Sequence, residues 1–434
     1  MKDIIKRLLV EWKEKEIPEI IDRETNLEEY LKMKINKIIV LNGFRRVGKT
    51  YLLYALIRKL LKQYSREEVI YMNFEDERIP LKTEFLSNVL PTANEIFNKK
   101  IKYLFLDEIH NIPDWGKWLR RIYDNYDLKI FVSGSSSKMS EEEIPTELRG
   151  RFLEVRVFPL SFKEFLDFKG LSFNLKEAEY SEKEKPFLLK ALNEYLIYGG
   201  LPEIVLENEN KKFELAQSYY STIIKRDIVE RYRVKNEETL KVLLRLLLDS
   251  KEYSINKTYN TFKSLGQEVG KNSVQRYISY IENSYFGFSV PIFSYKIKNQ
   301  VQYLKKIYFI DNVFIGSLST RFLNNFGRLY ENIVAVELRR RNKEIFYWKN
   351  LEKEEVDFVV KEKTRVKQLI QVCFDISEPD TKKRELKSIV KASKDLKCDN
   401  LILITENASG EENFEWFGIK RKIKFVPLWK WLLS

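Results

Sequence analysis

Short, largely apolar runs alternate with longer amphipathic segments along the first third of the chain. Residues 38–41 are four consecutive apolar residues, and comparable runs lie at 69–74, 103–106 and 130–132. Runs of this length are typical of strands buried on both faces, and the segments between them carry apolar residues at helical spacing. This alternation predicts an α/β fold in which helices cover both faces of a parallel sheet. Ligands of such sheets bind beyond the carboxyl ends of the strands, and each of these runs is followed by polar residues.

The first apolar run leads directly into a loop framed by glycines. The loop has the pattern G-x-x-x-x-G-K-T and is followed by a helical segment. Two glycines let the backbone curl so that its N–H groups point at phosphate oxygens, and the helix adds its positive N-terminal end. Lys49 is expected to reach the β- and γ-phosphates, and the Thr50 hydroxyl is expected to bind Mg²⁺. The sequence therefore predicts a nucleoside triphosphate site formed by Gly43, Phe44, Arg45, Arg46, Val47, Gly48, Lys49, Thr50 and Tyr51.

Two carboxylates follow the run at 103–106. Asp107 is expected to hold Mg²⁺ directly or through its water shell, and Glu108 is expected to orient the attacking water. An acidic pair at this place could instead open a helix for reasons of the helix dipole. His110, the only histidine, completes the pattern Asp-Glu-x-His found in helicases, but one short pattern carries little information and we favour a structural role.

Further polar residues could complete this site. Ser133 and Ser135 follow the run at 130–132 and could sense the γ-phosphate or position water, although serines there could also form an ordinary turn. Arg149 and Arg151 are candidates for stabilising transition-state charge, in cis or from a neighbouring subunit, or for a plain role at a sheet edge. Arg23 could approach the nucleotide from the side of the loop or lie on the surface.

Later segments add a resemblance to a known family. They are Phe158-Pro159-Leu160-Ser161-Phe162, Tyr198-Gly199-Gly200-Leu201-Pro202 and Lys225-Arg226-Asp227-Ile228. Together with the two nucleotide motifs, they make most of the chain resemble the archaeal AAA+-type ATPases related to the signal-transducing STAND class. In that family a P-loop core is followed by a winged helix and a nuclease-like tail. The resemblance implies binding of ATP and Mg²⁺ at Gly43, Gly48, Lys49, Thr50, Asp107 and Glu108.

The segment 236–320 is consistent with a winged helix. Residues 254–262 could form the first helix of a helix-turn-helix, and apolar residues after Gly270 recur with the period of a second helix. Residues 295–299 and 303–309 could form the two strands of the wing. DNA contact is the prediction for this segment, and packing between domains is the alternative. The side chains that can meet phosphates or base edges are Lys271, Asn272, Gln275 and Arg276.

The segment 321–434 resembles the restriction-endonuclease-like fold, in which a helix glutamate, a strand aspartate and an E-x-K sequence bind Mg²⁺ and activate water. Glu331 and Asp357 fit the first two roles, whereas Gln371 and Cys373 stand where the second carboxylate and the lysine belong. An amide is a poorer ligand than a carboxylate and a thiol cannot replace an ammonium, so we expect an inactive or weakened nuclease site. The missing charge could come from the following helix, which carries Lys382, Lys383 and Lys387.

Composition narrows the choice of partners. A length of 434 residues predicts two to four domains, and the net charge of +13 favours an anionic partner, nucleic acid before membrane, or else reflects a mixed-charge surface. Two cysteines exclude a disulfide framework and fit a reducing compartment. The charged N-terminus does not have the apolar core of a signal peptide, and no apolar run approaches the roughly 18 residues that span a bilayer. We therefore expect a cytoplasmic protein without a membrane partner.

These observations combine into one hypothesis. We predict an AAA+-like P-loop core with N-terminal helices (1–158), a helical lid (159–235), a winged helix (236–320) and an α/β nuclease-like domain (321–434). The function is expected to be an ATPase that uses ATP and Mg²⁺, acts as a nucleotide-driven switch, binds DNA and could form homo-oligomers. The alternatives are a metal-dependent nuclease licensed by ATP and a signalling scaffold that oligomerises with ATP without nucleic acid.

Overall fold

The structure is a computed structural model that describes residues 1–135, 146–174, 177, 181–319 and 326–434. The described chain forms two compact units, Met1–Phe158 and Pro159–Ser434. The predicted domain boundary between residues 320 and 321 lies outside the described residues.

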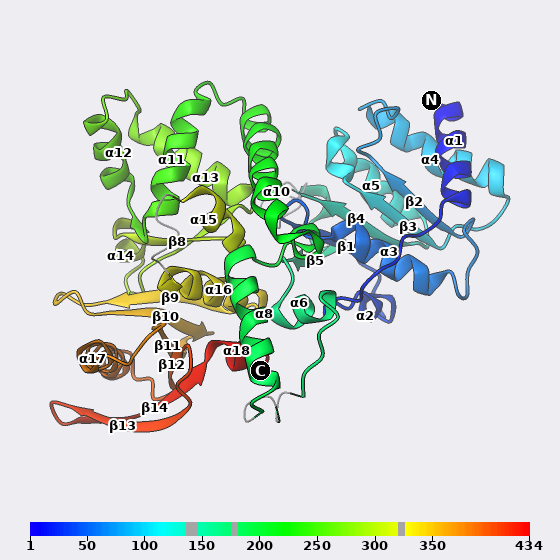
Figure 1. The fold of residues 1–434 in the computed structure, drawn as a ribbon. Coiled ribbons are helices and arrows are strands. Elements are labelled where there is room, and N and C mark those ends of the chain that lie inside the picture. Colours follow the sequence, from blue (N-terminus) through cyan, green and yellow to red (C-terminus); the bar gives the residue numbers. More distant parts are fainter. Residues whose placement is uncertain (136–145, 175–176, 178–180, 320–325) are drawn as a thin grey trace. The chain divides into compact units, whose positions relative to one another are not determined.

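A sheet of five parallel strands forms the centre of the first unit (blue to teal in Figure 1). Residues 38–41 are at most 2% exposed, as expected for a strand covered on both faces. The parallel-sheet core predicted from the apolar runs is therefore confirmed. The strands, in the spatial order β2-β3-β4-β1-β5, are β1 (Ile38–Gly43), β2 (Val69–Asn73), β3 (Tyr103–Asp107), β4 (Lys129–Gly134) and β5 (Phe152–Val157).

Helices connect these strands. α1 carries its apolar residues on one face, so Ile5 and Leu9 enter the same apolar core as Leu86 and Val89 of α4. The helical segments are α1 (Lys2–Glu14), α2 (Glu28–Leu31), α3 (Lys49–Leu60), α4 (Thr83–Phe97), α5 (Trp115–Asn125) and the 3₁₀ turns η1 (Ile109–Asn111) and η3 (Thr146–Leu148).

The strand order positions the nucleotide motifs. β4 lies between β1 and β3, so the carboxyl ends of all three strands meet at one edge of the sheet. Gly43, Ser133 and Asp107 lie at or next to these ends. Ser133, one of the two serines considered for the site, therefore lies between the two nucleotide motifs.

The second unit begins with helices (green in Figure 1). Ser161 starts α6 with a capping box, in which its Oγ accepts a hydrogen bond from Glu164 N (3.1 Å) and Ser161 N donates to the Glu164 carboxylate (2.9 Å). The helices are α6 (Phe162–Phe168), α8 (Glu184–Tyr198), α9 (Pro202–Leu206), α10 (Glu209–Thr222), the π-helix η4 (Ile223–Glu230) and α11 (Glu237–Asp249).

A three-stranded antiparallel sheet with the order β6-β8-β7 follows α11. Its strands are β6 (Glu252–Tyr253), β7 (Gly287–Val290) and β8 (Lys305–Phe309), and its helices are α12 (Ile255–Ser264), α13 (Lys271–Asn283), α14 (Ile297–Gln302) and α15 (Asn312–Leu318). The expected wing strand at 295–299 is wrong, because α14 begins inside that segment and β7 supplies the partner of β8. The winged helix itself stays a prediction.

The rest of the second unit contains a six-stranded mixed sheet with the order β13-β14-β12-β11-β10-β9 (yellow to red in Figure 1). Its strands are β9 (Glu344–Lys349), β10 (Glu355–Glu362), β11 (Arg365–Val372), β12 (Leu401–Thr405), β13 (Gly410–Trp416) and β14 (Ile419–Pro427). Its helices are α16 (Phe326–Arg340), α17 (Pro379–Leu396) and α18 (Leu428–Leu432). In the described parts of both units, every helix is too short or too polar to cross a lipid bilayer.

Candidate nucleotide-binding site

The loop between β1 and α3 depends on its two glycines. Gly43 has φ +147°, and a Cβ at this position would lie 2.2 Å from the backbone oxygen of Val157 on β5. Gly48 has φ +93° and is the N-cap of α3, a left-handed conformation that glycine adopts without steric cost. The loop can therefore pass close to β5 and turn into the helix only with glycine at these positions.

Lys49 is held inside the curled loop. Its side chain is 5% exposed, and Nζ donates hydrogen bonds to the backbone oxygens of Gly43 (3.1 Å) and Phe44 (3.0 Å). Nζ also lies 3.9 Å from Glu108 Oε1. The ammonium therefore lies between the loop backbone and the end of β3, and its contact with the phosphates stays a prediction.

Asp107 is the buried acceptor of three hydroxyl groups. Its Oδ2 accepts hydrogen bonds from Thr50 Oγ1 (2.7 Å) and Tyr71 OH (2.8 Å), and its Oδ1 accepts one from Ser133 Oγ. Asp107 is 1% exposed, and burial raises the pKa of its carboxyl group. A hydroxyl and a carboxylate are oxygen ligands that suit Mg²⁺, so Thr50 and Asp107 could hold this ion together.

Glu108 is fixed by its backbone and by its neighbours. It has φ +54°, and its Oε2 accepts a hydrogen bond from Ser135 N (3.1 Å) and lies 3.2 Å from His110 Nδ1. Burial raises the pKa of Glu108, and the ammonium of Lys49 acts against this shift. The carboxylate is thereby placed next to Lys49, which is the position expected for a residue that orients water.

The serines after β4 support the two carboxylates. Ser133 Oγ donates to Asp107 and accepts a hydrogen bond from Glu108 N (3.0 Å), so its hydroxyl links the two acidic residues. Its contacts in this structure are with these protein groups, and a direct role at the γ-phosphate stays a prediction. Ser135 acts through its backbone N–H on Glu108.

Arg23 reaches the nucleotide loop from the side, which is one of the two positions that the sequence left open, and a contact with the nucleotide itself stays a prediction. Its Nη1 donates to the backbone oxygen of Val47 (2.9 Å), and its Nη2 donates to that of Phe158 (3.0 Å). The guanidinium therefore ties the loop to the end of β5.

The other loop residues differ in their surroundings. Phe44 and Val47 are buried, whereas Arg46 and Tyr51 are exposed, and Arg45 lies 3.3 Å from Glu75. The backbone N–H groups of the loop can donate hydrogen bonds to phosphate oxygens whatever the side chains are. Arg46 and Tyr51 have the exposure that a direct side-chain contact with a nucleotide requires.

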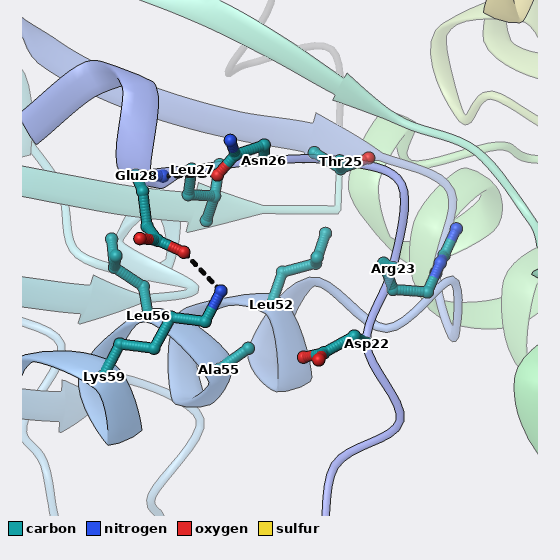
Figure 2. Close-up of a pocket in the computed structure, with 10 residues that line it drawn as sticks. All are labelled: Asp22, Arg23, Thr25, Asn26, Leu27, Glu28, Leu52, Ala55, Leu56 and Lys59. Atoms are coloured by element: carbon teal, nitrogen blue, oxygen red, sulfur yellow. Dashed lines mark hydrogen bonds and ion pairs between the residues drawn. The ribbon is translucent and has the colours of Figure 1, made fainter.

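A cavity of about 200 Å³ lies beside α3, within reach of the loop (Figure 2). The apolar side comes from α3, where Leu52, Ala55 and Leu56 share one helical face. Lys59 and Glu28 form an ion pair at the cavity. The other lining residues, all from the segment before β1, are Asp22, Arg23, Thr25, Asn26 and Leu27.

The cis roles expected of Arg149 and Arg151 are wrong. β5 runs parallel to β1, with Phe152 beside Ile38 and Val157 beside Gly43, so both arginines precede the strand at the end opposite the loop. At about 3.3 Å per residue, the length of β1 separates them from Lys49. Arg151 Nε instead pairs with Asp124 Oδ1 at 3.1 Å, and Arg149 is exposed. A role from a neighbouring subunit stays a prediction.

Tyr71 is a part of this site that the sequence did not indicate. Tyr71 lies on β2 next to β3, and its hydroxyl reaches the Asp107 carboxylate. A tyrosine in a buried strand is more often a core residue, so only the pairing of β2 with β3 identifies it.

In the second unit, the polar face of α13 is arranged as expected. Lys271, Asn272, Gln275 and Arg276 are all exposed, while Val274 and Ile278 are buried. The ammonium of Lys271 lies 5.3 Å from the ring centre of Tyr259 on α12.

The nuclease-like residues Glu331 and Asp357 also come together, around a lysine that the sequence did not indicate. Lys306 Nζ lies 2.8 Å from Glu331 Oε1 and 2.8 Å from Asp357 Oδ1. Burial disfavours the charged lysine, but Asp357 and Glu331 keep the pKa of Lys306 well above its usual value.

Gln371 is turned away from this lysine. Its Oε1 accepts a hydrogen bond from Asp357 N (3.2 Å), and its Nε2 donates to Glu385 Oε2 (2.6 Å). Cys373 Sγ faces the backbone oxygen of Asp375 at 3.2 Å. Neither side chain therefore takes the place of the missing glutamate or lysine.

The lysines expected to supply the missing charge have other partners. Lys382 pairs with Glu412 (2.6 Å) and Lys387 with Glu354 (2.6 Å). The ammonium of Lys383 lies 5.9 Å from the ring centre of Trp416. The expectation that α17 supplies this charge is wrong, because Lys306 of β8 occupies the position.

Comparison with known families divides the chain into three parts. A family described as an AAA domain matches residues 35–166. Two families described as domains of unknown function, DUF8612 and DUF4143, match residues 189–324 and 326–431. The first match confirms the prediction of a P-loop ATPase-like domain around the site.

Individual proteins similar to the chain come from archaea and bacteria. An uncharacterized protein of Methanocaldococcus jannaschii is 42% identical over 419 residues, which cover 94% of this chain and 91% of that protein. An uncharacterized protein of Haemophilus influenzae is 27% identical over 369 residues, which cover 83% of this chain and 88% of that protein. The solved structure of a Walker-type ATPase of Pyrococcus abyssi covers 69% of this chain and 96% of its own, with 17% identity and a TM-score of 0.48.

Proposed function

Because the chain belongs to the same family as the uncharacterized M. jannaschii protein and carries an AAA domain of the P-loop ATPase type, we propose that it binds ATP with Mg²⁺ and hydrolyses ATP. The observation that carries the proposal is the convergence of Lys49 and Thr50 at the start of α3 with Asp107 and Glu108 at the end of β3. Thr50 Oγ1 lies 2.7 Å from Asp107 Oδ2, and Lys49 Nζ lies 3.9 Å from Glu108 Oε1. These are the groups that hold a triphosphate, bind its metal ion and orient a water molecule.

In this proposal, each side chain has a separate task. Lys49 exchanges its hydrogen bonds to the loop carbonyls for bonds to phosphate oxygens, which carry more negative charge. Thr50 and Asp107 bind Mg²⁺, which supplies charge neutralisation between the phosphates when bound. Glu108 accepts a hydrogen bond from the attacking water, and the backbone N–H of Ser135 keeps its carboxylate in place.

The cavity beside α3 fits the nucleoside part of ATP. Its lining includes Leu52, two residues after Thr50, and Arg23, which also contacts the loop, so the cavity lies beside the phosphate-binding segment. Leu52, Ala55 and Leu56 provide an apolar surface for a base, and Asn26, Thr25 and Arg23 provide polar groups at the same cavity (Figure 2).

Two substitutions test the ATPase. Lys49→Ala removes a charge-assisted contact of about 1.5–3 kcal/mol, so ATP affinity should fall by about ten- to a hundredfold in calorimetry. Glu108→Gln should retain ATP affinity within about twofold and lose turnover, because the amide no longer attracts the proton of the water. Lys100→Ala is the matched control, because this lysine is 74% exposed and distant from the loop. Unchanged phosphate release in both site variants would exclude the proposal.

We further propose that α13 binds DNA and that the bound nucleotide, ATP or ADP, controls the affinity of this binding. The exposed face formed by Lys271, Asn272, Gln275 and Arg276 and the net charge of +13 support this part. Phosphate contacts release counterions, so affinity for duplex DNA should fall steeply as salt rises.

The DNA part is tested by gel shift at graded salt. The double variant Lys271→Ala and Arg276→Ala should weaken binding and lower the salt slope by about one per lost phosphate contact. Lys263→Ala on α12 serves as the control, because this lysine is exposed on the preceding helix. For a switch, the Glu108→Gln chain with ATP and the wild-type chain with ADP should differ in DNA affinity by about fivefold or more. Equal affinities in both states would contradict the switch.

A further inference from the structure

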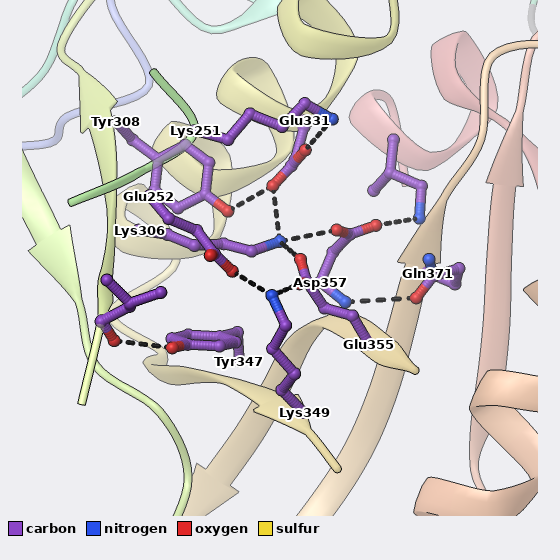
Figure 3. A network of polar contacts seen from close by, with 12 residues as sticks. Lys251, Glu252, Lys306, Tyr308, Glu331, Tyr347, Lys349, Glu355, Asp357 and Gln371 are labelled. Carbon is purple, nitrogen blue, oxygen red and sulfur yellow. Dashed lines mark hydrogen bonds and ion pairs between the residues drawn. The ribbon is translucent and has the colours of Figure 1, made fainter. Parts of the chain in front are cut away.

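Three carboxylate oxygens converge on one ammonium group in the second unit (Figure 3). Lys306 Nζ on β8 lies 2.8 Å from Glu331 Oε1 on α16, and 2.8 Å and 2.6 Å from Asp357 Oδ1 and Glu355 Oε1 on β10. The side chain of Lys306 is 1% exposed. A cation that belongs to the chain therefore occupies the centre of this cluster.

The second oxygen of each carboxylate has its own partner. Asp357 Oδ2 accepts a hydrogen bond from Val372 N (3.0 Å), and Glu355 Oε2 pairs with Lys349 (2.9 Å). Glu331 Oε2 pairs with Lys251 (3.4 Å). These contacts fix the orientation of the three carboxylates, so each presents one oxygen to the same central point.

The charges in the cluster are not balanced by the lysines alone. The ion pairs join Lys251, Lys306 and Lys349 to Glu331, Glu355, Asp357 and, through Lys349, to Glu252. Three ammonium groups against four carboxylates leave one negative charge. A divalent ion in place of the Lys306 ammonium would leave none.

We propose that the ammonium of Lys306 stands in for a divalent cation, and that Glu331, Glu355 and Asp357 form a latent site for a hard cation such as Mn²⁺ or Ca²⁺. Carboxylate oxygens are the ligands that such ions prefer, and Ca²⁺ takes them at 2.3–2.6 Å. The distances of 2.6–2.8 Å around Nζ need only a small contraction for that range.

With Lys306 in place, the wild-type cluster binds no divalent cation. Its ammonium is covalently attached and buried, so a metal ion would have to displace it from three charge-assisted contacts. As the chain stands, with the Lys306 ammonium between the three carboxylates, no group of three or more His, Cys, Asp or Glu side chains among the described residues could hold a metal ion. The nuclease-like residues therefore serve to join β8 to α16 and β10, and not to cleave nucleic acid.

The test is Mn²⁺ binding to the full chain without nucleotide, measured from the electron paramagnetic resonance signal of free Mn²⁺. Lys306→Met keeps the length of the side chain and removes its charge, so it should bind one more Mn²⁺ per chain than the wild type. Lys306→Met combined with Asp357→Asn should lose that ion. Lys251→Met should behave as the wild type, because Lys251 touches the same Glu331 from outside and is 56% exposed. Ca²⁺ should compete with Mn²⁺ for the new site.

Folding supplies a second measurement. Without metal, the Lys306→Met cluster has two more carboxylates than ammonium groups. The melting temperature of this variant should therefore be lower than that of the wild type, and it should rise again when Mn²⁺ is added. A variant that stays unfolded with and without Mn²⁺ would overturn the proposal, as would equal Mn²⁺ binding in the wild type and Lys306→Met. DNA cleavage by the wild type with Mn²⁺, lost in Lys306→Met, would also overturn it, because Lys306 would then be a catalytic residue.

Discussion

Asp107 receives hydrogen bonds from the hydroxyl groups of Thr50, Tyr71 and Ser133, which lie on three different elements. A carboxylate in a buried position is stabilised in its charged form by such donors. Thr50 and Ser133 belong to motifs that a sequence pattern can identify. Tyr71 adds a third donor from β2, on the side of β3 opposite β4. The stabilisation of the Asp107 carboxylate therefore depends on the pairing of β2 with β3.

Tyr71→Phe tests this dependence. Losing one hydrogen bond to Asp107 should cost about 0.5–1.5 kcal/mol of binding free energy. The affinity for ATP at fixed Mg²⁺ should therefore fall by about two- to tenfold in calorimetry. Binding of ATP measured without Mg²⁺ should change less, because Asp107 acts through the metal. Tyr123→Phe is the control, since it removes a hydrogen bond to Asn36 O (2.7 Å) elsewhere in the first unit. A Tyr71→Phe chain with unchanged Mg²⁺ dependence would contradict the role of this hydroxyl.

At the scale of elements, local patterns predicted the four strands with continuous apolar runs, including the edge strand β2, but not β5 at the other edge of the sheet. The run at 38–41 has no polar interruption, and its strand was correctly identified. β5 is only partly buried and carries Glu154 and Arg156 between apolar residues, so it has no continuous apolar run by which the sequence could reveal it. Without β5, the position of Arg149 and Arg151 at the far end of the sheet could not be recognised from the sequence.

The acidic cluster shows a different limit of sequence reasoning. The resemblance to the restriction-endonuclease-like fold indicates Glu331 and Asp357, because one lies in a helical segment and the other in an apolar strand segment that the sequence itself reveals. Lys306 comes from β8, which lies 25 residues before Glu331 and 51 residues before Asp357. No local pattern connects Lys306 with these two residues, whereas the lysines of α17 follow the nuclease-like strands closely in the sequence. The contact depends on the packing of β8 against α16 and β10.

The turn after α8 shows how two elements fix each other. Gly199 has φ +70°, and a Cβ there would lie 1.5 Å from Asp311 Oδ1 at the start of α15. Asp311 accepts hydrogen bonds from Gly200 N (2.8 Å) and from Val313 N (2.9 Å), so it caps α15 and holds the turn at the same time. The Tyr-Gly-Gly-Leu-Pro segment is thus a corner that requires both glycines and the aspartate.

Gly199→Ala should destabilise the second unit strongly. The new methyl group displaces the buried carboxylate of Asp311, and the left-handed backbone adds about 1 kcal/mol, so a drop of several kcal/mol is expected in urea unfolding. Gly170→Ala is the matched control, because Gly170 has a similar φ of +66° but no atom within 4 Å of a Cβ. The difference between the two variants isolates the clash with Asp311. Equal losses of stability would show that the close approach is not important.

At the scale of the whole molecule, neither Arg149 nor Arg151 lies near the nucleotide loop of its own chain. Arg151 is paired with Asp124 (3.1 Å), and Arg149 is exposed at the same end of the sheet, opposite the loop. An exposed arginine at that end is available to a second copy of the chain. Hydrolysis would then require association, as expected for an ATPase that receives its arginine from a neighbour.

A mixing experiment decides whether the arginine acts between chains. Arg149→Ala should lower ATP turnover by about a thousandfold if it supplies the transition-state contact, and wild-type turnover per chain should rise with protein concentration. Mixing Arg149→Ala with Lys49→Ala should restore turnover, because the first chain retains a working loop and the second retains the arginine. Arg120→Ala is the control, since Arg120 also pairs with Asp124 (3.5 Å). Turnover that is independent of concentration and unaffected by Arg149→Ala would remove this arginine from the mechanism and leave each chain to hydrolyse ATP alone.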